Sequence, residues 1–345
     1  MNGQFTVLSA GPALLLQDLG RQGYLAYGVT RGGAADVFAL HEGAALLGQD
    51  PNLAAIEMTG MGGSFRSDID TVIALTGAEM AAEIDGARLI WNASHALPAG
   101  ATLKIGGATK GTYGYLSVAG GFDVPLTMGA RSSHLTAGIG AGLKSGETLP
   151  LKAADPTRAG YFITPELRLN GGEVRVIASI QTEQFASETL KRFGQTAFSR
   201  DARGNRQGVR MAAEGEGFFT DGGLSIVSEV IIEGDIQITG DGAPYVLMCE
   251  CQTTGGYPRI GTVIACDLPR VAQAPVGAPL SFRFISLDDA REAEQAARKA
   301  LKGLPGKTAP LVRDPNDISD LLSYQLVSGV ISATADPESS EGENI

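Results

Sequence analysis

Hydrophobic and polar residues alternate in short segments, separated by glycines, through most of residues 5–285. Alternation with a period of two is typical of β-strands that bury one face. Seven segments show it most clearly: residues 71–75, 103–105, 113–118, 174–177, 231–238, 246–248 and 281–285. The pattern predicts a mainly β fold with a minor α content.

A short Gly-x-x-Leu phrase occurs three times, in PAGATLKI (98–105), KSGETLPL (144–151) and PVGAPLSF (275–282). Glycine permits the left-handed backbone of a tight turn, and the leucine would then point inward from the strand that follows. Each phrase could mark the closing edge of a barrel-like unit. Three occurrences of so short a pattern are weak evidence for duplication.

Helical spacing of apolar residues is confined to a few segments. Residues 34–47 and 180–193 are candidates, and residues 287–301 carry acids first and bases last, as the helix dipole favours. A further amphipathic helix is expected over residues 315–331, with Asn316 or Asp317 as its cap.

These features divide the chain into five parts. We expect a β-rich half over residues 1–151, a polar, proline-bearing linker over 152–172, and a second β-rich half over 173–286. A helical extension over 287–331 and a disordered acidic tail over 332–345 follow.

Composition restricts the partners of the protein. The 345 residues are 43% hydrophobic and 19% charged, which is typical of a folded globular chain. The 38 acidic against 27 basic residues give a net charge of −11, which disfavours nucleic acid and anionic lipid surfaces. Three cysteines, a start without basic residues and the lack of an 18-residue apolar stretch lead us to expect a cytoplasmic protein without a membrane segment.

Several familiar motifs fail on spacing. Gly306-Lys307-Thr308 resembles the end of a phosphate loop, but Leu301 stands where its first glycine is required. The glycines at 138, 140 and 142 are followed by Leu143 where a dinucleotide fingerprint needs glycine. Cys249, Cys251 and Cys266 lack a fourth soft ligand nearby, so we expect buried thiols and no metal site.

Three polar clusters are the candidate sites. The first joins Gln17, Asp18 and Arg21 with Asp36, the second is Arg131-Ser132-Ser133, and the third is 252–257, QTTGGY. An Asp–Arg turn pair, a helix cap at Asp36 and a solvated loop are the structural alternatives. In the functional interpretation, the arginine fork and hydroxyls suit a carboxylate or an amide. We expect all three clusters to meet in one cleft.

The clusters stand within a longer series of motifs. These are GPALLLQDLGRQGY, GVTRGGAADVFAL, AAIEMTGMGG, ALTGAEM, YLSVAGGFDVP, MGARSS, NRQGVRM, EGDIQITGDGAPYVLM and QTTGGYPRIGTV. In this order they resemble the family of biotin-dependent carboxyltransferases, also called allophanate hydrolase subunit 2, which includes the C subunit of 5-oxoprolinase and the carboxyltransferase part of urea carboxylase. The family's usual pattern has an Asp shortly before QTTGGY, where this chain has Glu250 between two cysteines.

The resemblance implies a cyclophilin-like β-barrel architecture and an enzyme subunit acting on a small amide. It also implies a smaller partner subunit of related fold, and possibly a third subunit or a biotin carrier. ATP-dependent opening of 5-oxoproline to glutamate is the leading hypothesis. A carboxyltransferase component of a biotin-dependent urea or amide carboxylase is the alternative, and a regulatory binding protein for a kinase-inhibitor partner is the alternative of another class.

Candidate roles follow from the resemblance and the residue types together. Asp18, Asp36, Arg131 and Gln252 are the candidate catalytic residues, with either aspartate as a base or as a partner of Arg21. Candidate substrate-binding residues are Gln17, Arg21, Ser132, Ser133, Thr253 and Tyr257. No Met-Lys biotin-attachment context is present, so carboxybiotin or ATP would be supplied through partner subunits.

Overall fold

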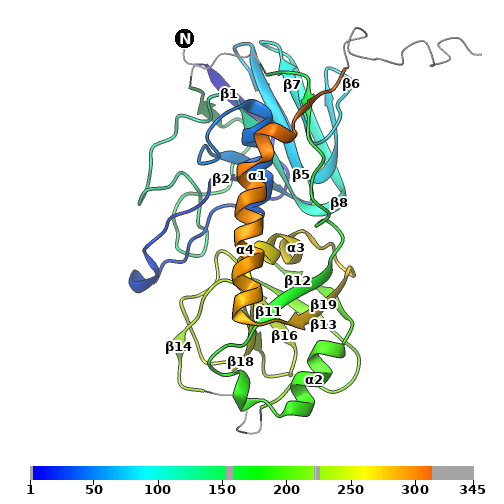
Figure 1. The fold of residues 1–345 in the computed structure, drawn as a ribbon. Coiled ribbons are helices and arrows are strands. Elements are labelled where there is room, and N and C mark those ends of the chain that lie inside the picture. Colours follow the sequence, from blue (N-terminus) through cyan, green and yellow to red (C-terminus); the bar gives the residue numbers. More distant parts are fainter. Residues whose placement is uncertain (1–2, 153–157, 221, 223–225, 313–345) are drawn as a thin grey trace, which may run out of the picture.

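The protein is described here from a computed structural model that covers residues 3–152, 158–220, 222 and 226–312. Two β structures dominate these residues, one above the other in Figure 1. The prediction of a mainly β fold is confirmed.

The first structure is an 11-stranded sheet around the long antiparallel pair β5 (Thr71–Ile84) and β8 (Thr102–Val118). Its other strands are β1 (Gln4–Ser9), β2 (Leu14–Gln17), β3 (Ala55–Thr59), β4 (Ser64–Ser67), β6 (Ala87–Arg88), β7 (Ala93–Leu97), β9 (Thr148–Pro150), β10 (Tyr161–Phe162) and β20 (Ala309–Pro310). Helix α1 (Val37–Leu47) packs on β5 and β8.

The second structure is a closed seven-stranded barrel. Its order is β11 (Gly172–Ile177), β18 (Arg259–Val263), β15 (Asp235–Ile238), β16 (Pro244–Leu247), β13 (Gly208–Ala212), β12 (Phe198–Gly204) and β19 (Pro279–Phe284). Phe193, Phe198, Phe218 and Phe282 pack together in its core with ring centroids 5.2–5.6 Å apart. A small separate pair, β14 (Glu229–Val230) and β17 (Thr254–Gly255), lies beside the barrel.

Helix α4 (Leu287–Lys302) connects the two structures. It runs along both of them in Figure 1, contacting β11 of the barrel and α1 of the first half. After it, the short helix η4 (Leu304–Lys307) leads to β20, which pairs with β10 in the first sheet. The domain boundary proposed at residues 152–172 stays a prediction, and β10, which lies inside that range, pairs with β7.

The Gly-x-x-Leu phrases behave as predicted. Gly100, Gly146 and Gly277 have positive φ angles of 79°, 86° and 81°. Each turn leads into a strand, β8, β9 or β19. The leucines that follow, Leu103, Leu149 and Leu280, are buried.

The predicted helices needed two corrections. The first begins at Val37 instead of residue 34, because the Asp36 carboxylate accepts hydrogen bonds from the backbone N–H groups of Phe38 and Ala39. Residues 180–193 do not form one helix. They contain η2 (Thr182–Gln184) and the start of α2 (Ser187–Gln195), separated by the extended, buried Phe185.

The predicted helix 287–301 is confirmed as α4, which a capping box between Ser286 and Asp289 begins. The remaining helices are short: η1 (Leu25–Tyr27), η3 (Ala265–Asp267) and α3 (Leu268–Gln273). The helix expected at 315–331 and the tail at 332–345 lie outside the described residues. In the described part of the chain, no helix has the length and apolar character to cross a membrane.

Candidate functional site

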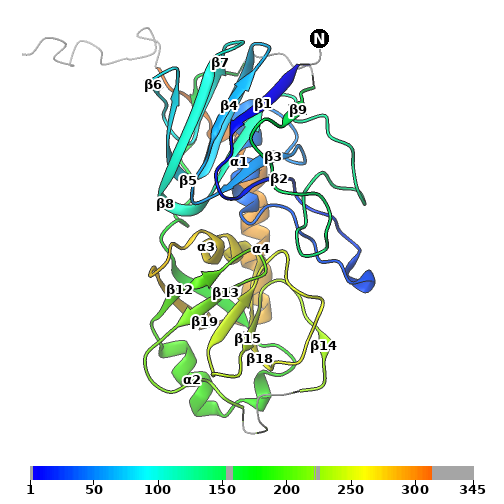
Figure 2. The ribbon, with the colours of Figure 1, turned by 180° about the vertical axis from the view of Figure 1, so that it is seen from behind.

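Three loop regions meet on one side of the molecule. The loop from β2 to α1 and the loop from β8 to β9 project from this side in both views (Figures 1 and 2). The third region, residues 249–256, follows barrel strand β16. The Gly32 N–H donates to the Cys249 carbonyl at 2.9 Å, which joins the first half of the chain to the barrel here.

The first two polar clusters are in direct contact. The Gln17 side-chain amide donates to the Ser133 carbonyl at 3.1 Å, and the Arg21 guanidinium donates through Nη2 to the Ser132 carbonyl. These bonds span more than 110 residues of sequence. The expected approach of residues 17–21 to residues 131–133 is therefore what the structure shows.

Asp18 also connects these two segments, residues 17–21 and 131–133, which together form the loop junction. One carboxylate oxygen accepts from the Gly20 N–H at 2.8 Å, and the other accepts from the Arg131 N–H at 2.5 Å. The Arg131 side chain turns away from Asp18 and donates through Nε to the Val124 carbonyl at 2.8 Å. These contacts favour a positioning role for Asp18, and its role as a base stays a prediction.

Several buried polar atoms in this junction have no hydrogen-bond partner among the described residues. They are Gln17 Oε1, Arg21 Nε and Nη1, and Ser132 Oγ. Arg21 is only 2% exposed. Burial lowers the pKa of Arg21, although Asp18 and Glu250 act in the opposite direction. Buried polar groups are normally paired, so unpaired ones concentrated at one place indicate a functional region.

His134 is a residue that the sequence reasoning missed. It is buried, and its Nε2 lies 3.0 Å from Thr30 Oγ1, which donates to the Cys251 carbonyl. Its Nδ1 accepts from the Ala137 N–H at 3.2 Å, which assigns the remaining proton to Nε2. Burial lowers the pKa of His134, so the ring is neutral and ties the three loop regions together.

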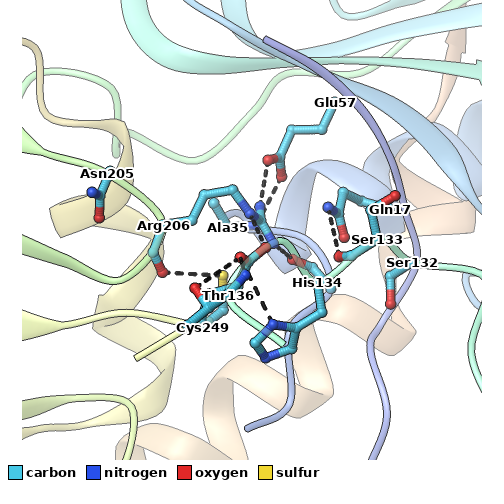
Figure 3. A network of polar contacts seen from close by, with 12 residues as sticks. Gln17, Ala35, Glu57, Ser132, Ser133, His134, Thr136, Asn205, Arg206 and Cys249 are labelled. Atoms are coloured by element: carbon cyan, nitrogen blue, oxygen red, sulfur yellow. Dashed lines mark hydrogen bonds and ion pairs between the residues drawn. The ribbon is translucent and has the colours of Figure 1, made fainter. Parts of the chain in front are cut away.

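Arg206, in the turn between β12 and β13, joins the barrel to the first half. Its guanidinium donates to Glu57 (Figure 3). It also donates to Glu250 and to the Gly33 carbonyl. Burial acts to lower the pKa of Arg206, but Cys249, Glu57 and Glu250 outweigh it and raise that pKa well above its usual value. Sequence reasoning noted this turn only as part of a motif, because its partners lie far away in the chain.

Asp36 belongs to another group of buried polar side chains that pair with one another. Besides capping α1, its carboxylate accepts from Arg168 at 2.7 Å and from Gln273 at 2.8 Å. Arg168 also forms a two-pronged ion pair with Glu42. Asp36 is fully buried, and these contacts favour the structural interpretation over a role as catalytic base.

The third cluster follows directly after Cys249 and Cys251, whose carbonyls accept hydrogen bonds from the loop between β2 and α1. Its β17 pairs with β14, and the Ile231 N–H donates to the Thr253 carbonyl. Gln252 and Tyr257 are exposed. Direct contact between this cluster and Arg131 is not seen in the described residues, and Asp36 belongs to the separate Arg168 group, so the structure brings together residues 17–21, residues 131–133 and the segment just before Gln252. None of the candidate residues lines the cleft between the halves, so their convergence on one cleft stays a prediction.

A cleft of about 660 Å³ opens beside the junction, between the two halves. Arg206 and Glu250 form part of its wall, and the N–H of Thr136, which also lines it, donates to Glu250 at 3.2 Å. Its remaining lining combines apolar side chains with amides and one lysine, among them Leu15, Leu135, Leu143, Lys144, Asn205 and Gln207. This cleft can accept a small molecule with both apolar and hydrogen-bonding parts.

The cysteines do not form a reactive or metal-binding group. Cys249 and Cys251 are buried free thiols, and burial raises the pKa of Cys249 to about 12. Within the described ranges, no group of three metal-ligating side chains comes together. The expectation of buried strand thiols is confirmed in burial for Cys249 and Cys251, although both follow β16 instead of lying within a strand. It is wrong for Cys266, which is half-buried in the short helix η3.

Comparison with known proteins supports the motif resemblance. A family model described as carboxyltransferase domain, subdomains A and B, matches residues 27–284. The chain is 32% identical over 303 residues to the 5-oxoprolinase C subunit of Escherichia coli K12, covering 86% of this chain and 96% of that protein. It is 27% identical over 329 residues to urea amidolyase of Saccharomyces cerevisiae, covering 89% of this chain but 18% of that protein.

Solved structures share the fold. A crystal structure of K. lactis urea amidolyase superimposes with a TM-score of 0.79 at 24% identity, covering 90% of this chain and 21% of that one. A structure of Kluyveromyces lactis urea carboxylase gives a TM-score of 0.77 at 24% identity, covering 90% of this chain and 31% of that one. In these two proteins, the matched fold forms one part of a much longer chain.

Proposed function

Because the chain belongs to the carboxyltransferase domain family, of subdomains A and B, we propose that it is a subunit of a cytoplasmic amide-processing complex, most similar in role to the C subunit of 5-oxoprolinase. The proposed reaction is ATP-dependent opening of 5-oxoproline to glutamate with a smaller partner subunit. The observation that carries this proposal is the relative's near-complete match together with a buried cluster of uncommitted donors at residues 17–21 and 131–133.

The cluster suits activation of a small amide. An amide nitrogen or carbonyl reacts poorly until fixed donors stabilise the charge that develops on it. Arg131 has its N–H and Nε engaged with Asp18 and Val124, which orients the rest of its guanidinium. Ser132 Oγ adds a donor without a competing partner in the described structure.

A second candidate function is carboxyl transfer, which the matching family model favours. Biotin, carried by another protein, would supply the carboxyl group. The cleft between the halves fits such a group, since the apolar Leu15, Leu135 and Leu143 suit its hydrocarbon chain and Gln207 suits its ring. In this function Arg206 and Glu250 would hold the wall of the cleft in place.

The test is reconstitution. The chain is purified with and without a co-expressed neighbouring subunit, and glutamate formed from 5-oxoproline and ATP is measured. Activity that needs both subunits supports the proposal. If 5-oxoproline is inert but, with a biotin carrier and a biotin carboxylase added, urea drives ATP hydrolysis that avidin blocks, the carboxyltransferase function replaces it. If both substrates are inert and the complex instead inhibits a kinase, the regulatory alternative replaces both.

Arg131→Lys is the first variant to measure in that assay. Lysine keeps the charge but loses the planar fork, so kcat/KM should fall by the equivalent of about 2–4 kcal/mol while the melting temperature stays near that of the wild type. Arg88→Lys, on exposed strand β6, is the matched control and should leave both unchanged. Wild-type turnover by Arg131→Lys would remove Arg131 from the site.

A further inference from the structure

Arg21 differs from the other buried arginines around the candidate site. Arg206 and Arg168 each pair with two carboxylates, and Arg31 forms a two-pronged pair with Glu233. Arg21 is at least as buried as these but donates only to the Ser132 carbonyl, so Nε and Nη1 lack partners in the described structure. Among the described buried arginines, Arg200 in the barrel, which donates to Thr112, also has no carboxylate partner. A buried guanidinium without a carboxylate is an incomplete ion pair.

The neighbouring orphan atoms have complementary chemistry. Ser132 Oγ is an unused hydroxyl. The Gln17 amide donates through Nε2 to the Ser133 carbonyl, which fixes its orientation and leaves Oε1 as an unused acceptor. The cluster therefore offers a cationic fork and a hydroxyl for an anion, and one acceptor for an N–H group.

We propose that Arg21, Ser132 and Gln17 form a subsite for a substrate that carries both a carboxylate and an amide N–H. This rests on the proposed function and deepens it by naming the substrate class. The carboxylate accepts from Arg21 and Ser132, and Gln17 Oε1 accepts from the amide N–H. Urea, which is neutral, would leave the Arg21 charge uncompensated.

Glycine at position 32 packs closely against the fork. A Cβ there would lie 3.2 Å from Arg21 Nη1 and 2.9 Å from His134 Cδ2. Gly32 also has a positive φ of 59°, which disfavours any side chain at this position. The orphan atoms are buried, so a ligand reaches them only when the neighbouring backbone moves.

Binding probes test the subsite without the catalytic assay. Isothermal titration is carried out with the full chain and with the reconstituted complex, using 5-oxoproline, 2-pyrrolidinone, urea and sodium formate. 2-Pyrrolidinone has the same ring amide as 5-oxoproline but no carboxylate. We expect 5-oxoproline to bind at least tenfold more tightly than 2-pyrrolidinone and urea.

Variants locate the carboxylate. Arg21→Gln should weaken 5-oxoproline binding at least tenfold and leave 2-pyrrolidinone unchanged, whereas the control Arg88→Gln should alter neither. Ser132→Ala removes only an unpaired hydroxyl and should weaken 5-oxoproline binding about threefold, which keeps the test available if Arg21→Gln does not fold.

Four results would overturn the subsite. The first two are equal binding of 5-oxoproline and 2-pyrrolidinone, and unchanged binding of 5-oxoproline by Arg21→Gln. The third is formate binding as tightly as 5-oxoproline, which would indicate an anion site only, and the fourth is no binding of any probe to either preparation. The proposed function fails separately, if 5-oxoproline binds through Arg21 but the complete complex forms no glutamate from it.

Discussion

Two buried polar regions lie side by side in this protein and differ in how completely their groups are paired. In the interface between the halves, Arg206 and Arg168 satisfy Glu57, Glu250, Asp36 and Glu42. In the loop junction around Arg21, four side-chain atoms have no partner in the described structure. The first region joins the two halves. The second region has unpaired polar atoms that a ligand can pair with.

Burial alone therefore does not distinguish a structural arginine from a binding one. Arg21 and Arg206 are both almost inaccessible, at 2% and 7% exposure. The number of carboxylates in contact separates them, since Arg206 has two and Arg21 has none within hydrogen-bond distance. The same substitution should accordingly lower stability strongly at Arg206 and change it little at Arg21.

The largest effect is expected for Arg206→Met. Removing the guanidinium leaves Glu57 and Glu250 buried without their cationic partner, which should lower the free energy of unfolding by about 3–5 kcal/mol. Urea denaturation measures the change. Arg203→Met, three residues away, removes an exposed ion pair with Asp201 and should leave the free energy of unfolding nearly unchanged, because solvent screens exposed pairs. Equal losses at both positions would show that the interface does not depend on Arg206.

His134 sharpens the comparison, because it borders both regions through Arg21, Glu250 and Arg206. Burial holds the pKa of His134 below its ordinary 6.5, so the unfolded chain binds this proton at a higher pH than the folded protein. Stability should therefore fall as the pH falls below about 6.5, with a slope of up to about 1.4 kcal/mol per pH unit from this residue.

His134→Gln should reduce that slope when urea denaturation is compared at pH 7.5, 6.5 and 5.5. Burial also lowers the pKa values of His41 and His95, so part of the slope should persist. His95→Gln, where Nε2 lies 2.7 Å from the Ile90 carbonyl, should remove only the separate share of the slope that comes from His95. An unchanged slope in His134→Gln would mean that this ring titrates normally in the folded protein.

Patterns in the sequence correctly predicted turns and one helix that depend only on neighbouring residues. The Gly-x-x-Leu turns and α4 depend on backbone conformation and on neighbouring residues, and both were predicted correctly. The segments 103–105 and 113–118 form a single strand, β8, because its two ends pair with different partners, β4 and β3. Those partners are distant in sequence, so no local pattern indicates the continuity.

The same limit applies to the candidate site. The motif order predicted that residues 17–21 and 131–133 belong together, and the structure shows hydrogen bonds between them. The Arg206–Glu57 pair joins residues 149 positions apart, and a single histidine in a glycine-rich loop has no periodicity to mark it. Whether a buried charge has a partner depends on tertiary packing. The sequence therefore could not show whether Arg21 or Arg131 would be buried without a carboxylate partner.

The smallest change in stability is expected for Arg21→Met. The substitution removes one hydrogen bond to the Ser132 carbonyl, but it also removes a buried charge and two N–H groups without partners in the described structure. Replacing an uncompensated buried ion by an apolar side chain of similar length is often neutral or stabilising, so the free energy of unfolding should change by less than about 1 kcal/mol. Arg206→Met, measured under the same conditions, supplies the matched contrast. If Arg21→Met instead costs as much as Arg206→Met, the guanidinium is structurally required, and the distinction between a saturated interface and an unsaturated binding region fails at the residue that best defines it.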